Sequence, residues 1–260
     1  MLPNFLIIGA ARCATTTLYS GLQAHPDIYL PRSKRPEPHF FLKDAEFSQG
    51  LAYYEQRYFA DWRGERAAGE ASTSYVFGAE VPRRVDEALP GVRLVCLLRN
   101  PVERAFSGYW HTVRSGLEKL SFEEALAQED RRKRELAGTP LGEIAPFAYV
   151  ERGLYHQQLQ RWFAVFDPSR LKIVLFEDFL AEPQRTLADV ASFLGVDPHA
   201  FRPRAFAKEN ASVADDATVP PNLHRALAAR FSDDVIALEQ LIGRDLRHWR
   251  IVPDAGRAAS

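Results

Sequence analysis

The chain has 260 residues, of which 46% are hydrophobic, enough for the core of one large domain or two small ones. Its 33 lysines and arginines almost balance its 34 aspartates and glutamates, so the formal net charge is -1. A nucleic-acid-binding protein usually carries a clear basic excess, and the composition therefore argues against a nucleic-acid partner.

The cysteines and the apolar runs indicate in which cellular compartment the protein is expected. Cys13 and Cys96 are too few for the disulfide framework of a small secreted domain and follow no metal-ligand spacing, so no metal site is expected. Met1–Asn4 carries no basic signal-peptide region, and no run approaches the ~18 apolar residues of a membrane helix. We therefore expect a cytoplasmic protein without a transmembrane segment. Abundant alanine and arginine suggest a bacterial source.

Short apolar runs, which predict buried strands, alternate with amphipathic or proline-led stretches, which predict helices. In chain order the predicted elements are a strand at 5–8, helices at 15–23 and 50–59, a strand at 67–72, a helix at 81–89, a strand at 92–98, helices at 101–115 and 155–166, a strand at 171–176, and helices at 183–194, 222–231 and 234–242. This alternation predicts a single α/β domain in which helices cover both faces of a parallel sheet.

The stretch at about 117–147 is the most polar part of the chain, and we expect it to be a helical insertion in the domain. Within it, residues 129–135 mix charges of both signs, a pattern typical of a solvated helix face. In the helix that follows, Tyr155, Leu159 and Trp162 recur at helical spacing and are expected to belong to the core.

The segment from Gly9 to Thr17, GAARCATTT, links the first strand to the first helix and has the features of an anion-binding loop. Helix N-termini attract anions, small residues allow close approach of the main chain, and Arg12 adds a forked cation. The loop that binds nucleoside triphosphates, G-x-x-x-x-G-K-S/T, has glycine and lysine where this chain has Ala14 and Thr15. The loop is thus P-loop-like without the lysine that grips the phosphates. Taken alone, it could also be an ordinary strand–turn–helix.

A second strand–turn–helix element carries Arg99 at the end of the strand at 92–98 and Ser107 two turns into the next helix. Ligands of open α/β sheets bind beyond the carboxyl ends of the strands, so Arg12 and Arg99 are expected to project toward the same edge. The two elements would suit a ligand phosphorylated at two separated places. The alternative for Arg99 is a surface ion pair with Glu103.

These motifs resemble, in the same order and over nearly the whole chain, those of the sulfotransferases that use 3′-phosphoadenosine 5′-phosphosulfate (PAPS), in particular the heparan-sulfate-type and bacterial branch. Residues 7–16 resemble the 5′-phosphosulfate loop, residues 98–109 the 3′-phosphate motif, and residues 37–41 the segment with the catalytic glutamate. Further similar segments lie at residues 69–75, 155–159, 208–212 and 243–249.

The resemblance implies in-line transfer of a sulfuryl group from PAPS to a hydroxyl or amine without a metal ion. It implies Glu37 as general base, with Arg12 and His39 as further catalytic residues. The cofactor, which leaves as adenosine 3′,5′-bisphosphate, would be bound by Arg12, Cys13, Ala14, Thr15, Thr16, Thr17, Arg99, Ser107 and Lys208. The acceptor is left open as a small molecule, a lipid, a glycan or a carrier-bound intermediate.

The chain departs from the family pattern at four positions. Arg12 and Ala14 replace the usual lysine and glycine of the loop, and Ala71 and Leu42 replace a lysine and an acidic residue of the heparan enzymes. The last two losses argue against heparan sulfate itself as the acceptor. Two other functions stay open: a non-catalytic module that binds adenosine bisphosphate and, less favoured, a P-loop nucleotide kinase.

Overall fold

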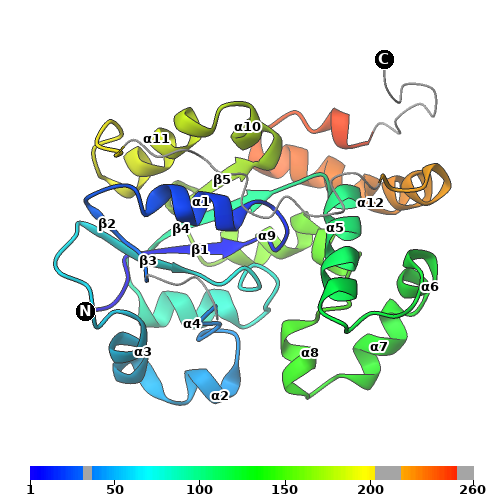
Figure 1. Ribbon diagram of the computed structural model, residues 1–260, viewed down its shortest axis with the longest axis horizontal. Helices are drawn as coiled ribbons and strands as arrows, with labels where there is room; N and C mark the ends of the chain where they lie inside the picture. Colours follow the sequence, from blue (N-terminus) through cyan, green and yellow to red (C-terminus); the bar gives the residue numbers. More distant parts are fainter. Residues whose placement is uncertain (32–36, 203–217, 251–260) are drawn as a thin grey trace. The chain divides into compact units, whose positions relative to one another are not determined.

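The computed structural model describes residues 1–31, 37–202 and 218–250, and within them five parallel strands form one sheet in the order β2-β3-β1-β4-β5 (Figure 1). The strands are β1 (Phe5–Gly9), β2 (Ile28–Tyr29), β3 (Ala67–Ala71), β4 (Arg93–Leu98) and β5 (Leu171–Leu175). The chain runs from β1 to one side of the sheet and returns past it to β4. The carboxyl end of β1 therefore lies where the strand order reverses, which is where ligands of such sheets bind.

Strand β1 lies at the centre of the sheet, hydrogen-bonded to β3 on one side and to β4 on the other. Its register places Leu6 opposite Glu70 and Phe5 opposite Gly69. Every residue of β1 and β3 is buried, which explains why these parallel strands read as short runs of small or apolar residues. Glu70 is the exception in this pattern, a carboxylate inside a buried strand.

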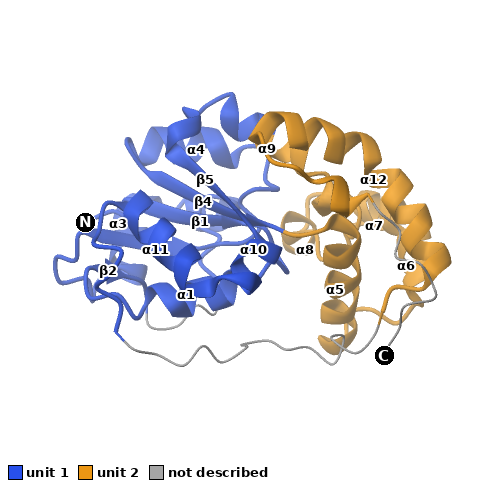
Figure 2. Cartoon of the chain, turned by 90° about the horizontal axis from the view of Figure 1, so that it is seen from above, with its two compact units in different colours: residues 1–98, 160–210 blue, residues 99–159, 211–260 orange. Residues whose placement is uncertain are grey.

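The chain divides into two compact units (Figure 2), the first made of residues 1–98 and 160–210 and the second of residues 99–159 and 211–260. In the first unit, α1 packs against α11 on one face of the sheet and α4 covers the other face (Figures 1 and 2). The helices of this unit are α1 (Thr15–Leu22), α2 (Asp44–Phe47), α3 (Gly50–Tyr58), α4 (Val81–Ala88), α10 (Phe176–Ala181) and α11 (Pro183–Leu194). The predicted α/β fold with helices on both faces of a parallel sheet is confirmed.

The second unit is helical in its described part, and in it α5 packs against α12. Its helices are α5 (Pro101–Arg114), α6 (Phe122–Ala127), α7 (Glu129–Glu135), α8 (Pro140–Ile144) and α12 (Pro221–Ile242), while α9 (Tyr155–Phe163) begins here and ends in the first unit. The side chains of Tyr155, Leu159 and Trp162 on α9 are buried, as predicted. That residues 117–147 are an insertion stays a prediction.

The prediction of two closing helices, at 222–231 and 234–242, is wrong, because α12 is continuous. No glycine or proline interrupts the chain between residues 222 and 242, and Asp234 has a structural use. Its buried carboxylate accepts hydrogen bonds from the main-chain N–H groups of His156 at 3.0 Å and Gln157 at 3.4 Å. A polar residue that looked like a helix boundary is therefore a packing contact in the helix interior.

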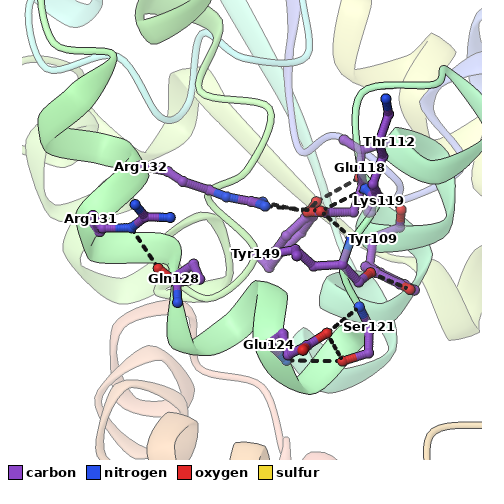
Figure 3. A network of polar contacts seen from close by, with 12 residues as sticks. Tyr109, Thr112, Glu118, Lys119, Ser121, Glu124, Gln128, Arg131, Arg132 and Tyr149 are labelled. Atoms are coloured by element: carbon purple, nitrogen blue, oxygen red, sulfur yellow. Dashed lines mark hydrogen bonds and ion pairs between the residues drawn. The ribbon is translucent and has the colours of Figure 1, made fainter.

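The prediction of a solvated face at residues 129–135 is wrong for Glu129 and Arg132. Glu129 is 4% exposed and accepts the main-chain N–H groups of Val150 and Glu151. Arg132 donates at 2.5 and 3.0 Å to the carboxylate of Glu118, which is wholly buried (Figure 3). Sequence pattern marked the segment as charged, but tertiary contacts decide which of its charges reach water.

Candidate active site

The loop between β1 and α1 begins at the carboxyl end of the central strand. Two of its residues, Arg12 with φ 73° and Ala14 with φ 60°, adopt left-handed backbone conformations. Such a conformation costs a non-glycine residue about 1–2 kcal/mol, which is the physical reason why glycine suits the position of Ala14. Ala14 is also the N-cap of α1 and supplies no side-chain cap, so the first turn relies on other partners for its main-chain N–H groups.

The side chains of this loop divide into buried and half-buried ones. Cys13 is completely buried as a free thiol, and its Sγ donates a weak hydrogen bond to the main-chain oxygen of Ala11 at 3.8 Å. Thr15 is 4% exposed, whereas Arg12, Thr16 and Thr17 are half-buried. The half-buried group thus combines one guanidinium with two hydroxyls at the start of α1.

The segment that follows β3 wraps around the carboxyl end of β1. The main-chain N–H groups of Ser72 and Val76 donate to the carbonyls of Ile7 at 3.1 Å and Ile8 at 2.8 Å. The approach is so close that a Cβ on Gly9 would lie 2.5 Å from Val76 Cγ1 and 3.2 Å from the Thr73 carbonyl oxygen. Glycine is therefore required at the start of the anion loop, which lies directly against Thr73.

Thr73 also holds the carboxylate of Glu37. Its main-chain N–H and its hydroxyl donate to Glu37 Oε2 at 2.8 and 2.9 Å, and His39 Nε2 lies 3.5 Å from the same oxygen. The side chains of Glu37 and His39 are 18% and 15% exposed, so the pair is largely shielded but still reaches solvent. The structure thus places Glu37 and His39 beside Thr73, whose carbonyl lies against Gly9 at the start of the anion loop.

A buried polar cluster underlies the loop that carries Glu37 and His39. The main-chain N–H of His39 donates to Ser72 Oγ at 2.8 Å, and the Ser72 hydroxyl donates to Glu70 Oε2 at 2.9 Å. Tyr54 donates to Glu70 Oε1 at 3.2 Å. Burial raises the pKa of Glu70 to about 7 against the effect of its hydrogen bonds. Sequence reasoning did not identify Thr73 or Glu70, although both lie in the segment at 69–75 that resembles a family motif.

Arg99 and Ser107 belong to the second unit. Arg99 directly follows β4 in the chain, its side chain is 20% exposed, and its Nη2 lies 3.6 Å from Glu103 Oε2, so the ion pair considered as an alternative is present. Its main-chain oxygen accepts the Tyr155 hydroxyl at 3.0 Å. Ser107 lies on α5 and is 7% exposed. Because Arg12 and Arg99 lie in different units, their convergence on one ligand stays a prediction.

Three further observations concern the predicted cofactors and partners. Lys208 lies outside the described residues. Among the residues that are described, no group of three or more His, Cys, Asp or Glu side chains is placed to hold a metal ion. In the same part of the chain, every helix is too short or too polar to cross a membrane.

Comparison with known proteins points to one family. The family model described as "Sulfotransferase domain" matches residues 2–208. The human heparan sulfate glucosamine 3-O-sulfotransferase 6 is 30% identical over 199 residues, which are 75% of this chain and 52% of that protein. The human bifunctional heparan sulfate N-deacetylase/N-sulfotransferase 3 is 29% identical over 210 residues, covering 76% of this chain and 23% of its own length. The chain therefore spans about half, or less, of these relatives.

A solved structure matches over nearly the whole length of this chain. The crystal structure of a sulfotransferase from Alicyclobacillus acidocaldarius is 37% identical, covers 96% of this chain and 100% of its own, and superposes with a TM-score of 0.82. This match and the family model confirm the resemblance seen in the sequence.

Proposed function

The chain belongs to the family of PAPS-dependent sulfotransferases, and from this premise we propose that it transfers a sulfuryl group from PAPS to a hydroxyl or amine. The observation that carries the proposal is the position of Thr73, which binds the Glu37 carboxylate and lies against Gly9 at the start of the anion loop. A candidate base therefore stands beside the loop that would hold the sulfuryl donor.

The loop after β1 fits an anionic cofactor. It combines the N-terminus of an eight-residue helix, which Ala14 does not cap, with the half-buried Arg12, Thr16 and Thr17. When bound, PAPS supplies a sulfuryl group already activated by its link to the 5′-phosphate. Arg12 would neutralise the charge that develops on the bridging oxygen as the bond to sulfur breaks. Preorganised donors at such a centre contribute about 3–4 kcal/mol each.

Glu37 would act as the general base. It would take the proton of the acceptor hydroxyl or amine while that oxygen or nitrogen forms its bond to sulfur in line with the leaving phosphate oxygen. Such proton transfer typically contributes about 10²–10⁴-fold to the rate. The two donors of Thr73 fix one carboxylate oxygen, and His39, 3.5 Å from it, would orient Glu37 or the acceptor.

We assign the 3′-phosphate of the cofactor to Arg99 and Ser107. Arg99 directly follows β4, and a guanidinium binds a phosphate with two parallel hydrogen bonds. Arg99→Ala should therefore weaken binding of adenosine 3′,5′-bisphosphate much more than binding of adenosine 5′-phosphate. Equal losses for the two nucleotides would contradict this assignment.

The proposal is tested by following radiolabelled sulfate from PAPS into a panel of phenols, lipids, oligosaccharides and carrier-bound hydroxyls. Glu37→Gln should abolish transfer and keep the rise in melting temperature that adenosine 3′,5′-bisphosphate produces. Glu87→Gln, which alters an exposed carboxylate on α4, is the matched control and should keep full turnover. Undiminished transfer by the Glu37 variant would remove Glu37 from the role of base.

The same panel separates the alternatives. A nucleotide kinase would be stabilised by ADP or GDP, whereas a sulfotransferase should respond to adenosine 3′,5′-bisphosphate. A non-catalytic module would show the bisphosphate response without transfer to any acceptor. The named relatives are heparan sulfate enzymes, but Ala71, which is 1% exposed, and Leu42 stand where the family resemblance implies charged residues in heparan enzymes. We therefore expect an acceptor less anionic than heparan sulfate.

A further inference from the structure

Glu70 is a carboxylate in the middle of β3, 1% exposed and opposite Leu6 of the central strand. Burying a carboxylate costs several kcal/mol unless it is well hydrogen-bonded. Among the described residues, the hydroxyls of Tyr54 and Ser72 donate to it at 3.2 and 2.9 Å, and the Tyr75 hydroxyl also interacts with it. All three are neutral, so this carboxylate is held by hydroxyl groups and not by a guanidinium or ammonium group.

Two of these hydroxyls make a second contact, with the loop that carries the candidate base. Ser72 Oγ accepts the main-chain N–H of His39 at 2.8 Å, and the Tyr75 hydroxyl accepts that of Phe41 at 3.3 Å. A hydroxyl has a single proton. When that proton is donated to Glu70, the lone pairs of the oxygen are left to accept the N–H groups of the loop. The ionised carboxylate therefore fixes the direction in which the Ser72 hydroxyl bonds.

The loop segment held in this way needs support from its surroundings. His39 has φ 48°, in the left-handed region that non-glycine residues occupy at a cost of about 1–3 kcal/mol. Its ring lies 3.5 Å from Glu37 Oε2, so the backbone position of His39 sets the geometry of that pair. Phe41, two residues further on, is wholly buried and anchors the other end of the segment.

We propose that Glu70 is a positioning residue for the Glu37–His39 pair, acting through the Ser72 hydroxyl on the main chain of His39. The inference rests on the proposed function, because it takes Glu37 as the general base. Glu70 itself would touch neither cofactor nor acceptor.

The protonation state of Glu70 should control this positioning near neutral pH. Burial raises its pKa to about 7, the hydroxyls of Tyr75, Ser72 and Tyr54 oppose that rise, and the charge of Glu37 adds to it. Tyr19, from α1, also faces it. Once protonated, Glu70 must donate its own O–H, and one of the surrounding hydroxyls loses its acceptor. The loop should thus become better fixed as pH rises through about 7.

The test that does not depend on turnover is NMR of the 15N-labelled chain. In the unaltered protein, the amide proton resonances of His39 and Phe41 should move with a midpoint near pH 7. Glu70→Gln should abolish that movement of both resonances. Tyr54→Phe removes a hydrogen bond to Glu70 that does not continue to the loop, and should move the midpoint upward because that bond lowers the pKa.

The controls make each outcome decisive. Glu129→Gln alters a buried glutamate of the second unit and should leave both loop resonances unchanged. If Glu70→Gln does not fold, the titration of the unaltered chain and its shift in Tyr54→Phe still decide the matter. A titration that persists in Glu70→Gln, or a midpoint that Tyr54→Phe leaves in place, would overturn the inference.

Turnover provides a second readout. Glu70→Gln should lower kcat by about 10- to 100-fold and leave KM for PAPS unchanged. This loss of rate corresponds to the free energy that a hydrogen bond to a charged group contributes. It should also keep the melting-temperature response to adenosine 3′,5′-bisphosphate. A rise in KM with unchanged kcat would contradict a positioning role. If the unaltered chain transferred no sulfate, the proposed function would fail, and the NMR titration would still decide whether Glu70 fixes the loop.

Discussion

Arg132 is the cation that pairs with the buried carboxylate of Glu118, and Arg132→Met tests how the second unit is held together. The guanidinium donates to Glu118 at 2.5 and 3.0 Å (Figure 3). Methionine keeps an apolar side chain of similar reach but leaves the anion with the Tyr149 hydroxyl and two main-chain N–H groups. Removing one partner of a buried ion pair typically destabilises a protein by about 3–5 kcal/mol.

The pKa of Glu118 gives an independent value for the free energy by which its hydrogen bonds stabilise the fold. Burial alone would raise it, but the hydrogen bonds from Arg132, the Leu120 N–H and Tyr149 outweigh burial and lower the pKa from 4.5 to about 2. That gap corresponds to roughly 3 kcal/mol of folding free energy. For a carboxyl group with a lowered pKa, this stabilisation is present above pH 4.5 and is lost as pH falls through 2. At pH 3 it should have fallen to roughly 1.4 kcal/mol.

Urea unfolding at pH 7 and at pH 3 measures both the loss of stability in the variant and its dependence on pH. Arg132→Met should lose about 3 kcal/mol or more at pH 7 and clearly less at pH 3. The matched control is Arg131→Met on the same helix, because Arg131 is 59% exposed and pairs with Glu135 at 3.2 Å on the surface. Such a pair is worth about 0–1 kcal/mol. Equal losses for the two variants, or a loss for Arg132→Met that does not change with pH, would refute the reasoning.

Three further predictions concern the first unit. Thr73→Val removes the hydroxyl that donates to Glu37 and should lower kcat for sulfate transfer by about 10-fold or more, whereas Thr73→Ser should retain the rate. Gly9→Ala places a methyl group against Val76 and should cost about 1–3 kcal/mol in urea unfolding; an unchanged free energy would contradict the close approach. Glu70 has a raised pKa of about 7, so its contribution to stability is present below pH 4.5 and is lost as pH rises through 7. The free energy of unfolding of Glu70→Gln, measured relative to the unaltered chain, should therefore rise by up to roughly 3 kcal/mol between pH 4 and pH 8. A difference between the two chains that does not change with pH would disprove this.

The central sheet could be predicted because its strands are buried on both faces. Such strands need apolar or small residues at every position, so β1 and β4 stand out as short apolar runs with turn residues at their ends. Strand β2 has two residues and helix α2 has four, too few for either periodicity to show. The continuity of α12 was missed because Asp234 resembles a helix boundary in sequence, and only its contact with α9 explains its place in the helix.

Residues of the candidate site could be predicted where they lie close together in the sequence and form a local motif. The loop at residues 9–17 and the segment with Glu37 and His39 each form a local motif. Thr73 is 36 residues from Glu37 in the chain, and its role depends on how the segment after β3 wraps around β1. No local pattern encodes such a pairing. The same holds for Arg132, whose buried partner lies 14 residues away.

The two buried glutamates, Glu70 and Glu118, show how the type of partner decides what a buried carboxylate can do. Both accept several hydrogen bonds, but only Glu118 receives them from a guanidinium, and its pKa falls to about 2. Glu70 is surrounded by neutral hydroxyls, and its pKa rises to about 7. Glu118 therefore stays ionised until the pH approaches about 2, which suits a fixed anchor. Glu70 is ionised at neutral pH only at a cost to stability, and a carboxylate kept at such a cost beneath a candidate base is better explained by positioning than by stability.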